Sequence, residues 1–194
     1  MRARRISWVT VAIGCASAMA GMAAGQAPAP SGSGGAAASA AGGATSAPCA
    51  PPVYRQFDFW VGNWDVKDPG GQVVGTNRIT REYDGCVLQE HWVALGPQKQ
   101  TGSSFNTYSP ATNRWHQTWV DSTGGFLLLD GGMADKSMVL AGDMPARRGT
   151  GTVRHRIAFT PNANGTVRQL WEVSRDGGQT WSVNFDGTYV RKAH

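Results

Sequence analysis

The stretch Phe57-Asp-Phe-Trp-Val-Gly-Asn-Trp-Asp-Val66 decides the fold. It is the first charged, aromatic and β-rich segment of the chain, and the sequence after it repeats the same pattern of short aromatic strands. Trp60, Trp64 and Val66 share one parity, so in a strand they would lie on one face. Gly62 between the two tryptophans fits a sharp bend or the close approach of another group. We therefore predict that this stretch opens a small closed barrel whose tryptophans plug one end.

The remainder of the chain reads as further short strands separated by turn sequences, among them Gly131-Gly132. Alternation of apolar and polar residues predicts ten strands, at residues 57–66, 72–82, 86–94, 101–109, 114–121, 125–131, 136–142, 151–160, 166–174 and 180–191. Short strands joined by glycine turns are typical of an antiparallel meander, and closure would remove its exposed edges. The prediction is an all-β fold, an antiparallel up-and-down barrel of about ten strands, with a two-sheet sandwich as the alternative.

Residues 1–25 have the layout of a secretory signal peptide, with arginines first, then a short apolar run and small residues at a cleavage site. The apolar run is too short to span a bilayer as an anchor. A lipoprotein signal, with a lipid anchor at Cys15, and a twin-arginine signal at Arg4-Arg5 are the alternatives. We predict a secreted or periplasmic bacterial protein with no membrane span.

Residues 26–52 are nearly all Ala, Gly, Ser and Pro and carry no charge. Such a segment cannot bury enough apolar surface to offset its conformational entropy, so we predict a flexible linker before a β-barrel domain at residues 53–194. The formal charge of the chain is +5, and removal of the three leader arginines leaves +2. We expect no nucleic-acid partner, because no basic cluster with interleaved aromatics remains. The pair Arg147-Arg148 is interpreted as part of a solvated loop.

Cys49 and Cys86 are the two cysteines that follow the leader, and we predict a disulfide between them. In an oxidising compartment this is the natural pairing, and two free thiols are the alternative. A bridge over this length would stabilise the fold by roughly 3–4 kcal/mol in the chain-entropy model. It would also tie the start of the domain to its third strand.

The segment Ser174-Arg-Asp-Gly-Gly-Gln-Thr-Trp181 matches the Asp-box pattern Ser-x-Asp-x-Gly-x-Thr-Trp at every fixed position. In that pattern the aspartate accepts hydrogen bonds from backbone amides, a glycine takes a positive φ, and the tryptophan packs beneath the turn. Asp-boxes are structural hairpins in several kinds of β-protein. A single copy therefore predicts a local turn and is no indication of glycosidase activity.

The tryptophan-bearing faces of the strands are predicted to point inward, because this keeps large aromatic rings out of water. The same choice places four polar residues inside, Glu90, Gln117, Gln169 and Arg191. Buried polar groups need partners, so these residues either form a network that braces the barrel or line a ligand pocket. The pocket interpretation predicts seven ligand-binding residues, namely Glu90, Trp92, Gln117, Trp119, Gln169, Trp171 and Tyr189.

Motifs for catalysis or metal binding are absent from the sequence. His91 and His116 fall on the faces opposite the tryptophans, whereas His155 could enter the interior, and no pair has metal-ligand spacing. No nucleophile–base motif, P-loop or dinucleotide fingerprint occurs. We expect no metal, no cofactor and no catalytic residue. An acid–base role of Glu90 together with His155 is the alternative.

Four segments together, at residues 57–64, 85–92, 114–121 and 168–191, resemble a widespread group of uncharacterised exported bacterial proteins. More distantly, Gly62-Asn-Trp64 and Arg191 resemble the lipocalin signature. That resemblance implies a calycin-like barrel in which Gly62, Trp64 and Arg191 have structural roles, with the arginine packed over the tryptophan. The predicted strand number departs from that of lipocalins. A ten-stranded barrel is also similar to the nitrobindin-like haem barrels, and His155 is the position that could supply their axial histidine.

The sequence thus predicts an exported β-barrel that binds a small molecule in a tryptophan-lined, polar cavity. Two alternatives remain open at this point. One is a haem-binding barrel ligated by His155, and the other is an enzyme that uses Glu90 as an acid or base in the cavity.

Overall fold

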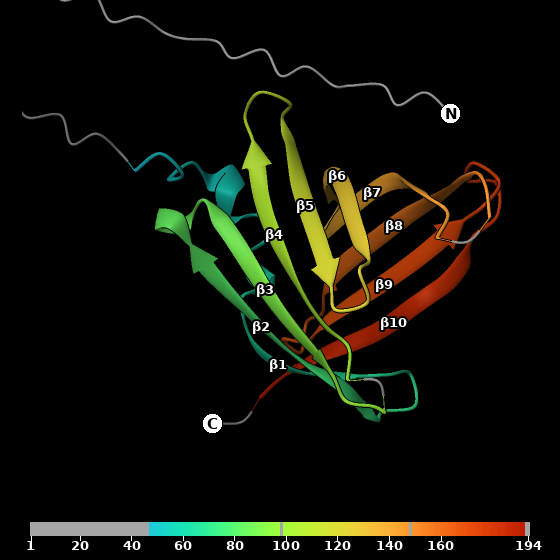
Figure 1. Cartoon of the computed structure of the whole chain (residues 1–194). Helices are drawn as coiled ribbons and strands as arrows, with labels where there is room; N and C mark the ends of the chain where they lie inside the picture. Colours follow the sequence, from blue (N-terminus) through green and yellow to red (C-terminus); the bar gives the residue numbers. More distant parts are fainter. Residues whose placement is uncertain (1–46, 98, 148, 193–194) are drawn as a thin grey trace, which may run out of the picture. The chain divides into compact units, whose positions relative to one another are not determined.

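The structure is a computed structural model that describes residues 47–97, 99–147 and 149–192. Figure 1 shows these residues as a barrel of antiparallel strands with short helical turns at its N-terminal end. The predicted signal peptide, Cys15 and the linker up to residue 46 lie outside the described residues. Within the described ranges, no helix has the length and apolar character that a membrane crossing requires.

Ten strands close into one barrel in the order β1-β10-β9-β8-β7-β6-β5-β4-β3-β2. Each strand is antiparallel to both neighbours, and the pair Trp64 and Arg191 belongs to the closing contact between β1 and β10. The predicted up-and-down barrel is confirmed and the sandwich is wrong. The strands are β1 (Gly62–Lys67), β2 (Val73–Glu82), β3 (Val87–Ala94), β4 (Thr101–Ser109), β5 (Arg114–Asp121), β6 (Phe126–Ala134), β7 (Ser137–Pro145), β8 (Thr152–Pro161), β9 (Val167–Ser174) and β10 (Ser182–Arg191).

The first strand begins later than predicted, at Gly62 instead of residue 57. Residues 57–61 do not extend it, because η2 (Asp58–Trp60) is a short 3-10 helix that follows another, η1 (Pro52–Arg55). The chain changes direction at Gly62, which has φ 147°, and the side chain of Arg191 occupies the space that a Cβ would need there. The close approach expected at this glycine is therefore confirmed. Trp60, in contrast, lies on a helical turn and not on the strand face.

Aromatic side chains from this N-terminal segment fill one end of the barrel. Phe57 stacks on Trp60 with ring centroids 4.9 Å apart, and both rings contact Phe159. The indole nitrogen of Trp64 donates to the carbonyl of Trp60 at 2.9 Å. All four rings are buried, so this end of the barrel is closed by packed side chains.

Arg191 covers the edge of this plug and does not point inside as predicted. Its guanidinium carbon lies 4.4 Å from the centroid of the Trp64 ring, in a cation–π contact, while the residue as a whole remains exposed. This is the packing that the lipocalin resemblance implies. The face assignment failed here because the last residue of a strand can leave the barrel at its rim.

The predicted turn at Gly131-Gly132 is also wrong. Both glycines lie inside β6, and the chain turns later, at Asp135, whose φ is 51°. A Cβ at Gly131 would overlap the carbonyl of Val139 on the neighbouring strand. Here glycine permits close contact between strands instead of a reversal.

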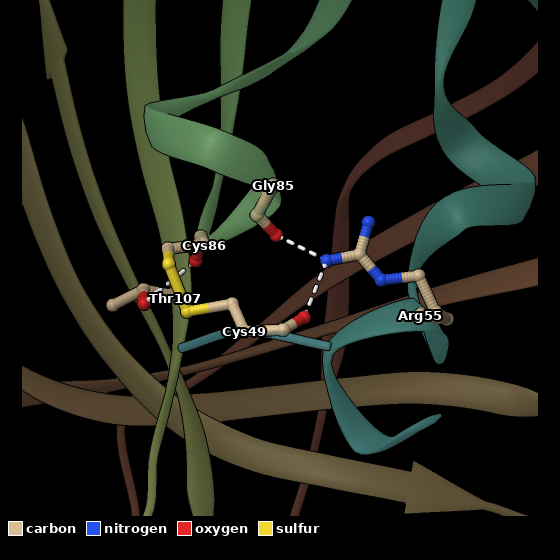
Figure 2. Close-up of a disulfide and its surroundings, with 5 residues drawn as sticks. All are labelled: Cys49, Arg55, Gly85, Cys86 and Thr107. Carbon is tan, nitrogen blue, oxygen red and sulfur yellow. Dashed lines mark hydrogen bonds between the residues drawn. A yellow bond between two sulfur atoms is a disulfide. The ribbon is translucent and has the colours of Figure 1, made fainter. Parts of the chain in front are cut away.

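The predicted disulfide is confirmed, since Cys49 and Cys86 are bonded just before β3 begins. Figure 2 shows Arg55 of η1 beside it. One guanidinium nitrogen of Arg55 donates to the carbonyl of Cys49 at 3.0 Å and also to the carbonyl of Gly85. The hydroxyl of Thr107 donates to the carbonyl of Cys86 at 3.0 Å. The bridge is thus embedded in hydrogen bonds that join the N-terminal segment to the β2–β3 turn.

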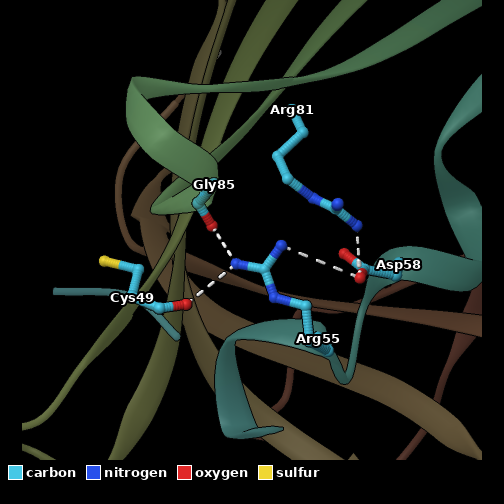
Figure 3. A network of polar contacts seen from close by, with 5 residues as sticks. All are labelled: Cys49, Arg55, Asp58, Arg81 and Gly85. Carbon is cyan, nitrogen blue, oxygen red and sulfur yellow. Dashed lines mark hydrogen bonds and ion pairs between the residues drawn. The ribbon is translucent and has the colours of Figure 1, made fainter. Parts of the chain in front are cut away.

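Asp58 extends this contact to the end of β2, as Figure 3 shows. Its carboxylate forms an ion pair with Arg81 and lies 3.9 Å from a guanidinium nitrogen of Arg55. Two arginines from different elements therefore converge on one carboxylate. The charges join η1 and η2 to the end of β2.

The turn between β9 and β10 has the predicted Asp-box geometry. The carboxylate of Asp176 accepts hydrogen bonds from the amide and the hydroxyl of Thr180, which lower its pKa below the usual range. Gly178, the glycine of the pattern, has φ 99°, and the indole of Trp181 donates to its carbonyl at 3.0 Å. The turn is therefore held by its own side chains.

Loss of the disulfide should lower the free energy of unfolding by about 4 kcal/mol, because the bridge joins residues 37 positions apart and restricts the unfolded chain. Urea denaturation of the wild type with and without a reductant measures this loss. The double variant Cys49→Ser/Cys86→Ser should have the reduced protein's stability and no response to reductant. Equal stability of the oxidised and reduced wild type would contradict the prediction.

Candidate functional site

The barrel is hollow at the end opposite η1 and η2. A cavity of about 840 Å³ opens there between the loops that follow β3, β5, β7 and β9, and we call this end the mouth. The volume lies within the range of cavities that hold small organic molecules. The prediction that the inward faces of the strands surround a common enclosed space is thus confirmed.

All seven residues predicted to bind a ligand lie on the wall of this cavity. They come from β3, β5, β9 and β10, and are Glu90, Trp92, Gln117, Trp119, Gln169, Trp171 and Tyr189. Strand parity was sufficient to identify them, because residues of one parity in a closed sheet share the interior. That they bind a ligand stays a prediction.

Three indole rings form the side walls. The Trp92 ring packs edge-on against Phe185, with centroids 6.0 Å apart. The indole nitrogen of Trp119 donates to the carboxylate of Asp121 at 3.3 Å. The third ring, that of Trp171, is likewise half-buried. Each of these rings therefore offers apolar surface to the cavity.

Glycines on adjacent strands allow two of these rings to lie against the backbone. A Cβ at Gly75 of β2 would overlap the Trp92 ring, and a Cβ at Gly102 of β4 would overlap the Trp119 ring. Because these positions carry no side chain, the indoles occupy the space beside the strands. The centre of the barrel mouth consequently remains open.

The floor of the cavity is polar and is centred on Glu90, which is 5% exposed. Its two carboxyl oxygens accept hydrogen bonds from the amide nitrogen of Asn77 at 2.7 Å and from the hydroxyl of Ser104 at 2.6 Å. The same Asn77 nitrogen donates to the hydroxyl of Tyr189 at 3.1 Å, and that hydroxyl donates to Gln169. Glu90 is thus connected, directly or through Asn77 and Tyr189, to residues of four other strands, β2, β4, β9 and β10.

The network continues along β4 and β5. Asn106 donates to the hydroxyl of Ser104 at 2.9 Å and to the carbonyl of Leu88 at 3.1 Å. Gln117 in turn donates to the side-chain oxygen of Asn106 at 2.8 Å. The network therefore braces the barrel, and four of its members also line the cavity, namely Glu90, Gln117, Gln169 and Tyr189.

Sequence reasoning missed three members of this network, Asn77, Ser104 and Asn106. Each lies on the same strand face as an apolar or aromatic residue, since Asn77 shares parity with the buried Ile79, and Ser104 and Asn106 share parity with the half-buried Tyr108. The signal was available, but β2 and β4 have no tryptophan to mark the inward face. Without such a marker, alternation alone does not identify the inward face of either strand.

Burial raises the pKa of Glu90 from 4.5 to about 7, although the hydrogen bonds from Ser104 and Asn77 act in the opposite direction. The carboxyl group is consequently uncharged over much of the acidic range. Burial likewise raises the pKa of the Tyr189 hydroxyl well above 10, so this group is a neutral donor at ordinary pH. The floor as a whole therefore presents neutral polar groups at mildly acidic pH.

His155 lies on the cavity wall, as expected, and the indole nitrogen of Trp171 donates to its Nδ1 at 3.1 Å. An indole N–H can only donate, so the neutral imidazole carries its proton on Nε2. Burial lowers the pKa of His155, which favours this neutral form. A metal bound at Nδ1 would displace the hydrogen bond from Trp171. A metal bound at Nε2 would require the proton to leave that nitrogen.

The other two histidines among the described residues lie outside the cavity. His116 faces outward, as predicted, with its ring nitrogens 2.9 Å from both Asp130 and Thr118. His91 lines a separate groove on the outer surface, with Arg78 among its neighbours. In the part of the chain that the structure describes, no three His, Cys, Asp or Glu side chains lie together as a metal site.

Charged side chains surround the mouth. Arg147 is exposed, as the solvated-loop interpretation expects, but it also lines the cavity and donates to the carbonyl of Thr123 at 3.1 Å. Partial burial opposes ionisation of Asp121, but hydrogen bonds from Thr123 and Gly125 outweigh it and lower the pKa to about 2. Asp121 is therefore a charged group whose oxygens are occupied by its own turn.

Two further mouth residues were missed for different reasons. Arg175 belongs to the Asp-box turn, and strand alternation says nothing about turns. Asn184 lines the cavity because the register of β10 shifts between Val183 and Phe185, which leaves Val183 63% exposed. A bulge of this kind reverses the alternation and is not visible in the residue pattern.

No protein-family model and no curated protein matches this chain. The resemblances noted in the sequence therefore stay predictions. Function has to be inferred from the cavity and its surroundings.

Substitution of Gly102 by Ala should push the Trp119 ring into the cavity, because the new methyl group would occupy the ring's position. We expect a loss of roughly 1–3 kcal/mol in the free energy of unfolding, together with a shift of tryptophan emission. Gly132→Ala is the control, since a Cβ at that strand position meets nothing within 4 Å. If Gly102→Ala behaves like the control, the proposed packing is wrong.

Glu90→Gln should remove a pH dependence of stability. Between 4.5, its pKa in the unfolded chain, and about 7, its pKa in the folded chain, the folded state keeps a proton that the unfolded state loses. The wild type's free energy of unfolding should therefore fall by about 3 kcal/mol as pH rises through this interval, relative to that of the variant. Urea denaturation of both proteins across the interval measures the difference. Parallel pH profiles would contradict the assignment.

Proposed function

We propose that this protein is exported and binds a small molecule in the cavity at the barrel mouth, without changing it chemically. The observation that carries the proposal is the convergence of seven predicted residues on one cavity of about 840 Å³. Apolar walls combined with a few directed polar groups are typical of small-molecule sites. The proposed ligand is therefore partly apolar and has at least one polar group.

The distribution of side chains supports a particular orientation of the ligand. Indole rings on several walls can stack against a flat or aromatic body, which favours such a body over a flexible chain. On the floor, the half-buried Gln169 presents a neutral amide, whereas Gln117 and Tyr189 are only 2% and 1% exposed. A polar but uncharged part of the ligand would face these groups.

Export is supported by the disulfide and by the predicted leader. Disulfides persist in oxidising compartments and are rare in the cytosol, so the bond between Cys49 and Cys86 favours a secreted or periplasmic location. The predicted signal peptide at residues 1–25 is consistent with this location. Its type stays open between ordinary secretion, a lipoprotein signal and a twin-arginine signal.

Binding is favoured over catalysis by the hydrogen bonds of the candidate acid and base. A pKa near 7 would suit an acid–base catalyst. However, both oxygens of Glu90 already accept hydrogen bonds from the barrel, and His155 is bonded to Trp171 and not to Glu90. The same bond to His155 opposes haem ligation. A bracing and binding role for Glu90 is the simpler account.

Native mass spectrometry of the protein purified from its own compartment tests the proposal. The wild type should carry the extra mass of a retained ligand. Val173 lines the cavity, so Val173→Trp should fill the mouth and abolish the extra mass. Val183→Trp, at an exposed position on β10, should retain it. Retention of the extra mass in Val173→Trp would show that the molecule binds elsewhere and contradict the proposal.

A further inference from the structure

Two arginines line the cavity at its mouth, Arg147 after β7 and Arg175 after β9. Among residues 47–97, 99–147 and 149–192, the ion pairs involve other side chains, and neither of these arginines has a carboxylate within ion-pair distance. Their positive charges are therefore not neutralised by a direct partner in the described part of the chain. Both side chains line the cavity and can contact a molecule bound there.

Hydrogen bonds hold both arginines at the mouth, Arg147 through its side chain and Arg175 through the turn that contains it. Arg147 donates to the carbonyl and the hydroxyl of Thr123, in the β5–β6 turn. Arg175 lies within the Asp-box turn, immediately before Asp176, whose carboxylate is occupied by Thr180 and does not line the cavity. The guanidinium group of Arg147 and the backbone at Arg175 are thus held in place before a ligand binds.

Two acidic residues line the same cavity, Asp121 at the mouth and Glu90 on the floor. Asp121 accepts hydrogen bonds from the amide and hydroxyl of Thr123, at 2.8 and 2.6 Å, and from the amide of Gly125 at 3.1 Å. Glu90 lies on the buried floor, where burial favours its neutral form. Asp121 keeps its negative charge, so two guanidinium charges face one carboxylate at the mouth and a net positive charge remains, while the walls are apolar.

We propose that the ligand is an aromatic anion, with its ring system between the indole walls and one carboxylate, sulfonate or phosphate group at the mouth beside Arg147 and Arg175. This inference rests on the proposed binding function and adds the chemical class of the ligand. Guanidinium groups bind such oxyanions through paired N–H donors, and they do so without needing a complementary cavity of their own. The anion would remain partly hydrated at the mouth, so the deep floor would not have to accept a charge.

A matched pair of fluorescent probes tests the inference directly. 8-Anilinonaphthalene-1-sulfonate and N-phenyl-1-naphthylamine have the same aromatic skeleton, but only the first carries a sulfonate. The wild type should bind the sulfonate probe about tenfold more tightly than the neutral probe at low ionic strength, as expected for two partly exposed charge contacts. Added salt should reduce this preference without weakening the neutral probe.

Arg147→Gln/Arg175→Gln should abolish the preference and leave the affinity for the neutral probe unchanged. Arg78→Gln/Arg114→Gln removes the same charge from two exposed positions outside the cavity, and it should keep the preference. This control separates contact at the mouth from the effect of net charge. Val173→Trp should weaken both probes, because it fills the shared site.

The outcomes separate the two proposals. If the neutral probe binds as tightly as the sulfonate probe, or if the preference survives in Arg147→Gln/Arg175→Gln, the anionic ligand class is wrong while the binding function stands. If neither probe binds the wild type and no retained mass is found, the binding function fails and the inference fails with it. If both probes bind Val173→Trp as tightly as they bind the wild type, they bind outside the cavity and the inference is overturned.

Discussion

Closure of the sheet by pairing between β1 and β10 is the constraint on which the rest of the structure depends. A barrel of ten strands is too wide for the side chains of a single layer to fill throughout. At one end the segment at residues 52–60 fills the interior, because Phe57 and Trp60 enter the lumen and pack there. The opposite end receives no such insertion, and it remains hollow.

The hollow end keeps its shape through a pairing of large and small residues. Trp92 lies against Gly75, and Trp119 lies against Gly102, so each indole uses space that a neighbouring strand leaves free. Below them, the hydrogen-bonded side chains around Glu90 fix the positions of the floor groups. Packing alone would favour collapse of the rings toward the centre, and these two devices together oppose it.

The strand pattern, the disulfide and the seven cavity residues could be predicted from the sequence, because each depends on local alternation or on the cysteines that follow the leader. Features that depend on contacts between distant strands could not. The 3-10 turn at Trp60 packs against Phe159 of β8. Arg191 pairs with Trp64 across the β1–β10 contact, and the bulge at Asn184 lies in the pairing of β10 with β9. The cationic mouth was missed because Arg147 and Arg175 lie in loops, whose direction alternation does not specify.

The turns that frame the mouth have a consequence for the kinetics of any molecule that enters. The carboxylates of Asp121 and Asp176 hold their turns closed through hydrogen bonds that exist without an occupant. At these two turns, little backbone order would therefore have to be gained on association. Entry and release would require no rearrangement there, and residence time would depend on the occupant's own contacts with rings and guanidinium groups.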